Sequence, residues 1–362
     1  MNFIARPLDL VIIGRSILSS YGNPTAGLYR GLINELAQRG HRTTFLEPFD
    51  PVMNAHRDML RSPYCEVWTY ADTDQLIDNY YAAIKSADIV MLGNGVPDAD
   101  RIAEWIANTA RGVTVYYDTN LARTRQALEE DRGDNDCLSC RTVSNFHLFL
   151  STTGGPALEQ LAYKHGIDRA RPLYASIDPY SYYRTDAEKT YDLGFIGNHH
   201  AGREELLNRY LLAPARITPN RRFALAGDGY SVDYDWPPNL VRLEHLPEAN
   251  HVDFYNRQRC TLFLCREDRR QLGFTPSRRL LAAAACGVPV LSDHWNGLED
   301  FFELDREIFR VDEDHDVLDV LYHTDGAQLR RVGQAGRERV LRDHTTEVRT
   351  RQLLDYWEEV MD

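Results

Sequence analysis

The stretch GFTPSRRLLAAAACGVPVLSD, residues 273–293, combines a glycine turn, a helix and a short strand. Thr275 or Ser277 can cap the start of the helix, and Pro276 suits its first turn. The run of alanines allows close packing against a neighbour, and a Cys-Gly pair ends the helix before a strand at 288–291. This order of turn, helix and strand is typical of an α/β protein.

The same alternation extends to both sides of this stretch. Residues 8–14 (LDLVIIG) form a continuous apolar run, as in a parallel strand buried on both faces. Repeated β-loop-α order predicts doubly wound parallel sheets, whose strands end at one edge, where ligands bind. We expect further strands at 43–46, 88–92, 113–117, 146–150, 193–196, 223–226, 240–243 and 261–264, and helices at 25–39, 102–110, 155–165, 203–212 and 325–360, the last with a break near 343–344.

The chain length of 362 residues favours two or three domains. Prolines and clustered tyrosines interrupt the alternation at 172–190, which is typical of a linker. We expect an α/β protein with two Rossmann-like, doubly wound parallel-sheet domains facing a central cleft. The expected parts are an N-terminal domain at 1–175, a linker at 176–190, a C-terminal domain at 191–342 and a terminal helix at 343–362 that packs back across the N-terminal domain.

Composition excludes several classes of protein. Lys and Arg number 41 and Asp and Glu 54, and the net charge of −13 argues against non-specific coating of nucleic acid. No apolar run approaches the ~20 residues of a membrane span, and no signal-peptide pattern opens the sequence, so we expect a cytoplasmic protein. Six cysteines are too few for a disulfide scaffold, and the lone C-x-x-C at 137–140 is interpreted as a loop feature rather than a zinc or redox site.

Several segments of the C-terminal half can bind an anion. A helix that starts near 275–277 offers free N–H groups, to which Arg278 and Arg279 can add charge-assisted hydrogen bonds to a diphosphate. Gly197 and Asn198 follow a predicted strand, and Arg203 lies just beyond them. The alternative is an ordinary packed helix and a plain turn. Further candidates are Arg266, whose charge can neutralise an anion, and Gly227, which lies in a Gly-Asp-Gly turn after a predicted strand. Adjacent histidines at 199–200 lack the spacing of a metal site.

In the N-terminal half, the loop after the first strand faces the ligand edge. It contains the candidate ligand-binding residues Ser20, Gly22, Asn23 and Thr25. It lacks the G-x-G-x-x-G fingerprint, so no nicotinamide or flavin cofactor is expected. Asp118 ends a strand on the same edge and is a candidate base or polar contact for a ligand hydroxyl; the alternative is a helix cap.

Several ordered motifs resemble family 4-like, group 1 glycosyltransferases of the two-lobed GT-B fold, and most closely the CgeB-like, spore-maturation branch. The resemblance covers nearly the whole chain. Besides 273–293, the motifs are DLGFIG at 192–197 with Arg203, WPPN at 236–239, HLP at 245–247, His251 with Phe254 and Tyr255, SDHWNGLE at 292–299, GH at 40–41, FLE at 45–47, YDT at 117–119 and TTGGPAL at 152–158.

This resemblance implies a retaining, metal-independent transfer of a hexose or pentose from a nucleoside-diphosphate sugar, without a further cofactor. The C-terminal lobe would bind the donor, with Arg203 and Arg266 neutralising the leaving group. A homodimer is possible, and the acceptor stays open between a spore or cell-surface component, a modified DNA base and a small molecule. The implied donor residues are Gly197, Asn198, Gly227, Gly273, Phe274, Thr275, Pro276, Ser277, Arg279 and Glu299, with Gly227 beside the nucleotide base. The implied acceptor residues are Ser20, Gly22, Asn23 and Thr25, and Asp118 would contact the acceptor hydroxyl.

The sequence departs from the family at two positions. Ala282 stands where these enzymes carry the glutamate that holds the ribose hydroxyls, and Phe274 replaces an earlier glutamate. Glu299 or Asp300 would have to compensate, or the donor would carry a 2′-deoxyribose, as in a dTDP-sugar. The alternative hypotheses are a catalytically degenerate nucleotide-binding or partner protein and a nucleotide-sugar epimerase.

Overall fold

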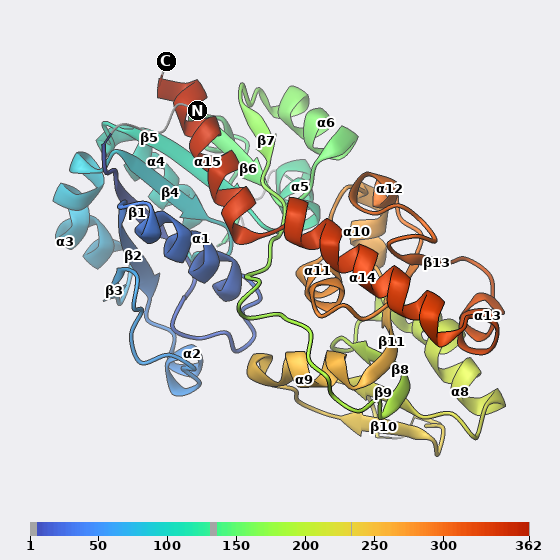
Figure 1. Ribbon diagram of the computed structural model, residues 1–362. Helices are drawn as coiled ribbons and strands as arrows, with labels where there is room; N and C mark the ends of the chain where they lie inside the picture. Colours follow the sequence, from blue (N-terminus) through green and yellow to red (C-terminus); the bar gives the residue numbers. More distant parts are fainter. Residues whose placement is uncertain (1–5, 131–135, 233, 362) are drawn as a thin grey trace. The chain divides into compact units, whose positions relative to one another are not determined.

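The computed structural model describes residues 6–130, 136–232 and 234–361 (Figure 1). The chain divides into two compact units. Unit 1 comprises Met1–Ala175 and Thr346–Asp362, and unit 2 comprises Ser176–Thr345. The chain thus leaves unit 1 after Ala175 and re-enters it at Thr346.

Unit 1 is built on a seven-stranded parallel sheet with the strand order β3-β2-β1-β4-β5-β6-β7. The central strands are almost entirely apolar and buried, because helices cover both faces of the sheet. The strands are β1 (Asp9–Ile13), β2 (Arg42–Pro48), β3 (Glu66–Tyr70), β4 (Ile89–Gly93), β5 (Val113–Asp118), β6 (Leu148–Ser151) and β7 (Ala170–Pro172).

The C-terminal helix α15 (Thr346–Met361) belongs to unit 1, where it packs beside α1 (Ala26–Gln38). Its Leu353 and Trp357 are buried in the core of this unit, together with Leu32 and Ile33 of α1. The other helices of unit 1 are α2 (Pro51–Ala55), α3 (Thr73–Ser86), α4 (Ala99–Thr109), α5 (Leu121–Glu129), α6 (Gly155–His165) and the 3₁₀ helix η1 (Val143–Asn145).

Unit 2 is built on a six-stranded parallel sheet with the order β10-β9-β8-β11-β12-β13. Its strands are β8 (Tyr191–Ile196), β9 (Phe223–Ala226), β10 (Leu240–Leu243), β11 (Gln258–Phe263), β12 (Val290–Asp293) and β13 (Phe309–Val311). Its helices are η2 (Ala201–Arg203), α7 (Glu204–Leu207), η3 (Asn208–Leu212), α8 (Ala213–Ile217), η4 (Glu248–Asn250), α9 (His251–Asn256), α10 (Glu267–Leu272), α11 (Arg278–Ala285), α12 (Leu298–Phe301), α13 (Asp316–His323) and α14 (Gly326–Asp343).

The predicted fold class, two parallel-sheet α/β units, is confirmed. The helix expected at 203–212 is instead a continuous run from 201 to 217 with a π-helical segment at Asn208–Leu212. The strand expected at 288–291 begins two residues later, at Val290. Shorter elements that the pattern did not predict include the edge strands β3, β7 and β13 and helix α10.

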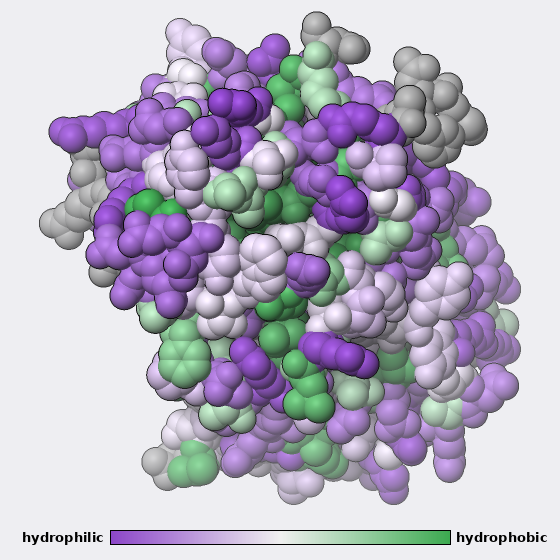
Figure 2. All heavy atoms as spheres, turned by 90° about the vertical axis from the view of Figure 1, so that its left-hand side faces the viewer, coloured by the Kyte–Doolittle hydropathy of each residue, from purple (hydrophilic) through white to green (hydrophobic). Residues whose placement is uncertain are grey.

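On the face drawn in Figure 2, hydrophilic side chains predominate and hydrophobic ones form small spots between them. Within the described ranges, no helix has the length and apolar character that a membrane span requires. Among the described residues, none of the six cysteines forms a disulfide, and this includes Cys137 and Cys140 of the C-x-x-C motif.

Candidate functional site: an arginine cluster at a strand switch

The second sheet has a switch point between β8 and β11. From β8 the chain continues to β9 and β10 on one side, and then returns to β11 on the other. The loops after β8 and β11 therefore diverge at the carboxyl edge, which is where open parallel sheets bind their ligands. Gly197 and Asn198 follow β8, and Cys265 and Arg266 lie after the end of β11.

Two glycines bring the loops after β8 and β9 into direct backbone contact. Gly227 has a φ of +151°, and a Cβ atom there would lie 2.1 Å from the carbonyl oxygen of Gly197. The hydroxyl of Tyr230 donates to the same oxygen at 2.7 Å, and the Asp228 N–H donates to Asn198 Oδ1 at 3.2 Å. Both predicted glycines thus shape one tight turn.

Arg203 reaches this turn with its guanidinium. Its Nη2 donates to the Asn198 carbonyl at 2.6 Å, and the group lies 5.6 Å from the centre of the Phe195 ring. Within the described residues, no carboxylate forms an ion pair with Arg203. Burial, together with the positive charges of Arg279 and Arg266, lowers the pKa of Arg203 to about 10.

Arg269 and Arg279 share this lack of acidic partners. Neither forms an ion pair with any carboxylate of the described chain, although both are partly buried. Burial, and then the charges of Arg266 and Arg279, lower the pKa of Arg269. Like charges at close range are unfavourable without a counter-anion. We call Arg203, Arg269 and Arg279 the arginine cluster.

Other arginines of this region are neutralised by carboxylates. Arg266 contacts Asp268 through two hydrogen bonds of 3.1 and 2.8 Å, and Arg270 pairs with Glu267. Arg278 forms an ion pair of 2.5 Å with Glu248. The Arg278 guanidinium, which we expected to donate to a diphosphate, is therefore paired with a carboxylate in this structure. The predicted role of Arg266 in neutralising the leaving group stays a prediction.

The helix predicted to bind an anion begins beside the cluster. Ser277 Oγ accepts a hydrogen bond of 3.3 Å from the Arg279 N–H, so Ser277 caps α11. Pro276 and the buried Thr275 precede it. Gly273 and Phe274 both have positive φ, of 69° and 44°, and the Phe274 N–H donates to the carbonyl of Asn296 at 2.7 Å.

The residues at the two departures from the family are an alanine and an aromatic ring. Ala282 is 2% exposed in α11, and the ring of Phe274 packs against Gly297. Glu299 Oε1 lies 3.0 Å from His294 Nε2. Burial alone would raise the pKa of Glu299, but its hydrogen bonds and the His294 ring lower it. Glu299 is therefore an ionised carboxylate with a partner already in place.

The predicted acceptor residues in unit 1 hold their own loop together. Asn23 is buried, and its Nδ2 donates to the carbonyls of Ser16 and Ser19 at 2.7 and 3.2 Å. Thr25 Oγ1 donates to Asn23 Oδ1 at 2.7 Å. Ser20 donates to Asp58 from its hydroxyl and its N–H, and Gly22 adopts a φ of +60°. Their role toward an acceptor stays a prediction.

Asp118 is fully buried at the end of β5. Its Oδ1 accepts from the Asn120 N–H at 3.1 Å and from Thr124 Oγ1 at 2.9 Å, at the start of α5. Its Oδ2 accepts from Ser151 Oγ at 3.3 Å. These contacts hold the turn before α5, whose N-cap residue is Asn120. The role of Asp118 as a base stays a prediction.

One group of side chains in the described residues has the spacing of metal ligands: His315, Asp316 and Asp319, of which His315 and Asp319 are exposed. The adjacent His199 and His200 have other contacts. His199 Nε2 lies 3.8 Å from Glu204, and His200 Nδ1 accepts from the Gly202 N–H at 3.1 Å.

Comparison with protein families gives a match for residues 203–355, to the family described as glycosyl transferase-like. No curated protein matches the sequence significantly. Among solved structures, an alpha-glucosyltransferase in complex with UDP has a TM-score of 0.72 and 12% identity, covering 97% of this chain and 100% of its own. An alpha-glucosyltransferase in complex with UDP-glucose and DNA containing an abasic site has a TM-score of 0.71 and 11% identity, covering 98% of this chain and 100% of its own.

Two further solved structures have the same fold. Anabaena Alr3699/HepE in complex with UDP-glucose has a TM-score of 0.69 and 12% identity, covering 97% of this chain and 100% of that one. Sucrose-phosphate synthase from Thermosynechococcus elongatus has a TM-score of 0.68 and 13% identity, covering 98% and 99%. This chain therefore has the GT-B fold along its whole length, and its residues 203–355 are similar to the glycosyl transferase-like family.

Proposed function

We propose that this protein is a glycosyltransferase that takes its sugar from a nucleoside-diphosphate donor bound by unit 2. The observation that carries the proposal is the arginine cluster. Three guanidiniums that form no ion pair with a carboxylate of the described residues lie near the switch point of a parallel sheet, where an anionic ligand is expected. A diphosphate supplies the missing negative charge.

The cluster also fits the chemistry of sugar transfer. When the bond from the sugar to the diphosphate breaks, negative charge develops on the leaving oxygen. Guanidiniums that are already fixed in place stabilise that charge without reorganisation. Arg203 is held by the Asn198 carbonyl and the Phe195 ring, so its position does not depend on the ligand. The UDP complexes among the structural neighbours support a nucleotide donor.

The finer assignments follow the resemblance to CgeB-like enzymes. We propose retaining, metal-independent transfer of a hexose or pentose, with neither metal nor other cofactor required. The acceptor class is a spore or cell-surface component, a modified DNA base or a small molecule. We further propose a cytoplasmic location. DNA in a complex with one structural neighbour keeps the DNA base among the candidates.

Ala282 and Phe274 favour a second candidate, a binding protein that has lost catalysis. Thermal shift with UDP, GDP, ADP, dTDP and CDP, with and without magnesium, tests the donor site for both. A ligand at 100 times its Kd stabilises by about 2.7 kcal/mol. Turnover of the matching nucleotide sugars then separates the candidates. Release of the nucleotide above background supports the transferase, a changed sugar without an acceptor supports an epimerase, and binding without turnover supports the binding protein.

A further inference from the structure

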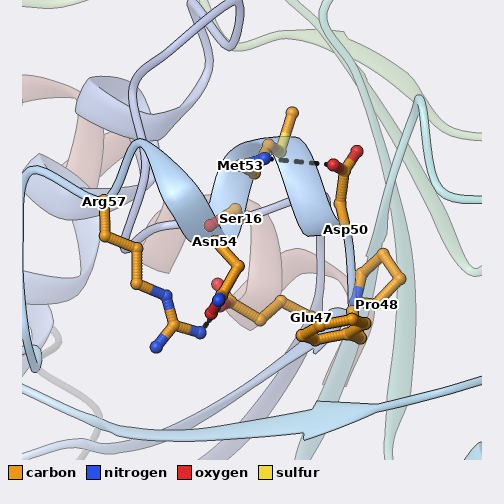
Figure 3. Close-up of a pocket in the computed structure, with 8 residues that line it drawn as sticks. Ser16, Glu47, Pro48, Asp50, Met53, Asn54 and Arg57 are labelled. Atoms are coloured by element: carbon orange, nitrogen blue, oxygen red, sulfur yellow. Dashed lines mark hydrogen bonds and ion pairs between the residues drawn. The ribbon is translucent and has the colours of Figure 1, made fainter.

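A small recess opens in unit 1 where β1 and β2 end (Figure 3). It holds about 10 Å³, which is room for a single water molecule or one hydroxyl oxygen. It lies at the carboxyl edge of the first sheet, the edge at which parallel sheets bind ligands. The recess is lined by Ser16, Glu47, Pro48, Phe49, Asp50, Met53, Asn54 and Arg57.

A buried carboxylate and a guanidinium form part of this wall. The Glu47 side chain is 4% exposed, and that of Arg57 is 30% exposed. Glu47 Oε2 accepts a hydrogen bond of 3.0 Å from the Ile17 N–H, and Oε1 lies 3.5 Å from Arg57 Nη2. Charge-assisted hydrogen bonds are usually 2.7–2.9 Å long. The Glu47–Arg57 pair is therefore loose, and Figure 3 shows the Arg57 side chain directed toward Glu47.

Two of the neighbouring polar side chains, Asp50 and Ser16, are already used by the fold. Asp50 Oδ1 accepts from the N–H groups of Val52 and Met53 at 2.8 and 3.0 Å, which caps α2. Ser16 Oγ accepts from two N–H groups of its own loop, each at 3.2 Å. A carboxylate can accept about four hydrogen bonds and a guanidinium can donate five. Glu47 and Arg57 therefore keep hydrogen-bonding capacity for a ligand.

The chemistry of the pair selects a neutral hydroxyl. One hydroxyl can donate to Glu47 and at the same time accept from Arg57, which satisfies both groups. The pair is neutral as a whole, so an added ion would leave a net charge in the recess, whereas a hydroxyl would not. Exposed apolar side chains lie on the segments on either side: Phe49 is 52% exposed, and Tyr21, 47% exposed, stacks on His56 at 4.1 Å. A saccharide presents hydroxyl groups beside apolar C–H faces. A site with polar groups and aromatic side chains side by side therefore suits a saccharide.

We propose that the Glu47–Arg57 recess binds one hydroxyl of a neutral saccharide and so forms part of the acceptor site. This inference rests on the proposed function, and it names a saccharide as the acceptor class. It adds a pair with spare hydrogen-bonding capacity to the predicted acceptor residues Ser20, Asn23 and Thr25, whose side chains also hold their own loop.

Saturation-transfer NMR and calorimetry with the full-length protein test this proposal. The probes are the methyl glycosides of glucose, galactose, mannose and N-acetylglucosamine, each with UDP present. Glu47→Gln keeps an oxygen for the Ile17 N–H and removes the charge, and Arg57→Met keeps the aliphatic stem. We expect at least one glycoside to bind, and each variant to weaken it about tenfold or more, as does removal of one hydroxyl from that glycoside.

The matched controls are Glu35→Gln and Arg39→Met, which break an ion pair of 2.5 Å on α1 in the same unit. They should leave saccharide binding unchanged. Unchanged binding in both Glu47→Gln and Arg57→Met would overturn the proposal, as would no glycoside binding to wild-type protein that turns over its donor. Loss of donor turnover with saccharide binding intact would instead count against the proposed function alone.

Discussion

The carboxylate of Asp293, at the end of β12, accepts a hydrogen bond of 2.7 Å from the backbone N–H of Cys265, just after β11. Its second oxygen is buried without a hydrogen-bond partner among the described residues, and Arg270 Nη1 lies 3.8 Å from it. Asp293 therefore joins two strand ends beside the arginine cluster. Burial raises the pKa of Asp293 to about 7, although the Cys265 N–H and Arg270 act in the opposite direction.

This raised pKa predicts a pH-dependent stability. In the unfolded chain, the Asp293 carboxyl ionises once the pH exceeds the ordinary aspartate pKa. In the folded chain, the same carboxyl stays protonated until about pH 7. The free energy of unfolding should therefore fall between about pH 4 and pH 7. Asp293→Asn removes this fall. The free energy of unfolding of the variant, relative to that of wild type, should therefore be higher at pH 8 than at pH 4, by an amount of the order of 4 kcal/mol or less. Denaturant titrations at both values measure the difference.

Asp192→Asn is the control of opposite sign. Burial alone would raise the pKa of Asp192, but hydrogen bonds from the Arg222 N–H and from the Arg221 and Arg259 guanidiniums lower it. The stability that Asp192 contributes is complete above the ordinary aspartate pKa and is lost as the pH falls below it, so the deficit of this variant relative to wild type should be larger at pH 6 than at pH 2. The same sign for both variants would contradict the assignment for Asp293.

Gly227→Ala should damage the turn beside the arginine cluster. The added Cβ would lie 2.1 Å from the Gly197 carbonyl oxygen, at a φ that side chains avoid. We expect a loss of about 1–3 kcal/mol in the free energy of unfolding, measured by denaturation. Gly229→Ala is the matched control, because its nearest neighbour would lie 3.4 Å away. Equal losses would show that backbone conformation alone, and not the contact with Gly197, sets the cost.

Arg269→Met should stabilise the protein in the absence of ligand. Arg269 lacks a carboxylate partner in the described chain, and burial and neighbouring arginines make its charge unfavourable. The expected signature is a higher Tm for the free protein combined with a smaller Tm increase on adding UDP. Arg259→Met, which removes an ion pair of 2.9 Å with Asp192, should lower the Tm instead. A lower Tm for Arg269→Met would contradict the account of the cluster.

Ribose contacts should contribute little to donor binding. Ala282 and Phe274 stand where the resembling family has glutamates, and no carboxylate at either position can hold the ribose hydroxyls. We therefore expect UDP and 2′-deoxy-UDP to bind with affinities within about threefold of each other, since a lost charged hydrogen bond would cost at least tenfold. Calorimetry with both nucleotides decides this. A tenfold preference for UDP would place another group, such as Glu299 or Asp300, on the ribose.

Periodicity predicted the long buried elements well. The strand at 223–226 and the helix at 155–165 have the predicted bounds, and the C-terminal helices break at Asp343 as expected. The edge strands could not be predicted from periodicity, because they are short or half exposed. In β3 (EVWTY), for example, only Tyr70 is buried. Helix α10 could not be predicted either, because its six residues, EDRRQL, are mostly charged and show no apolar face.

The candidate site was only partly predictable. Glycine turns after strands pointed to Gly197 and Gly227, and Arg203 and Arg279 were identified beside them. Arg269 lies in a charged run, EDRRQ, in which nothing in the sequence separates an arginine that has a carboxylate partner from one that has none. In the folded chain, Arg266 pairs with Asp268 and Arg270 pairs with Glu267. Which arginines pair in this way depends on the directions of their side chains, and these directions are set only by folding.

The most direct test of the central claim is calorimetric titration of UDP, in EDTA and at low salt, into wild-type protein and the Arg203→Ala/Arg279→Ala double variant. Arg209→Ala, whose guanidinium pairs with Asp314 on the surface of the same unit, is the control. Melting curves check that each variant is folded. The account predicts binding to wild type and control, and affinity at least about a hundredfold weaker in the double variant. Equal affinity in all three proteins would contradict it.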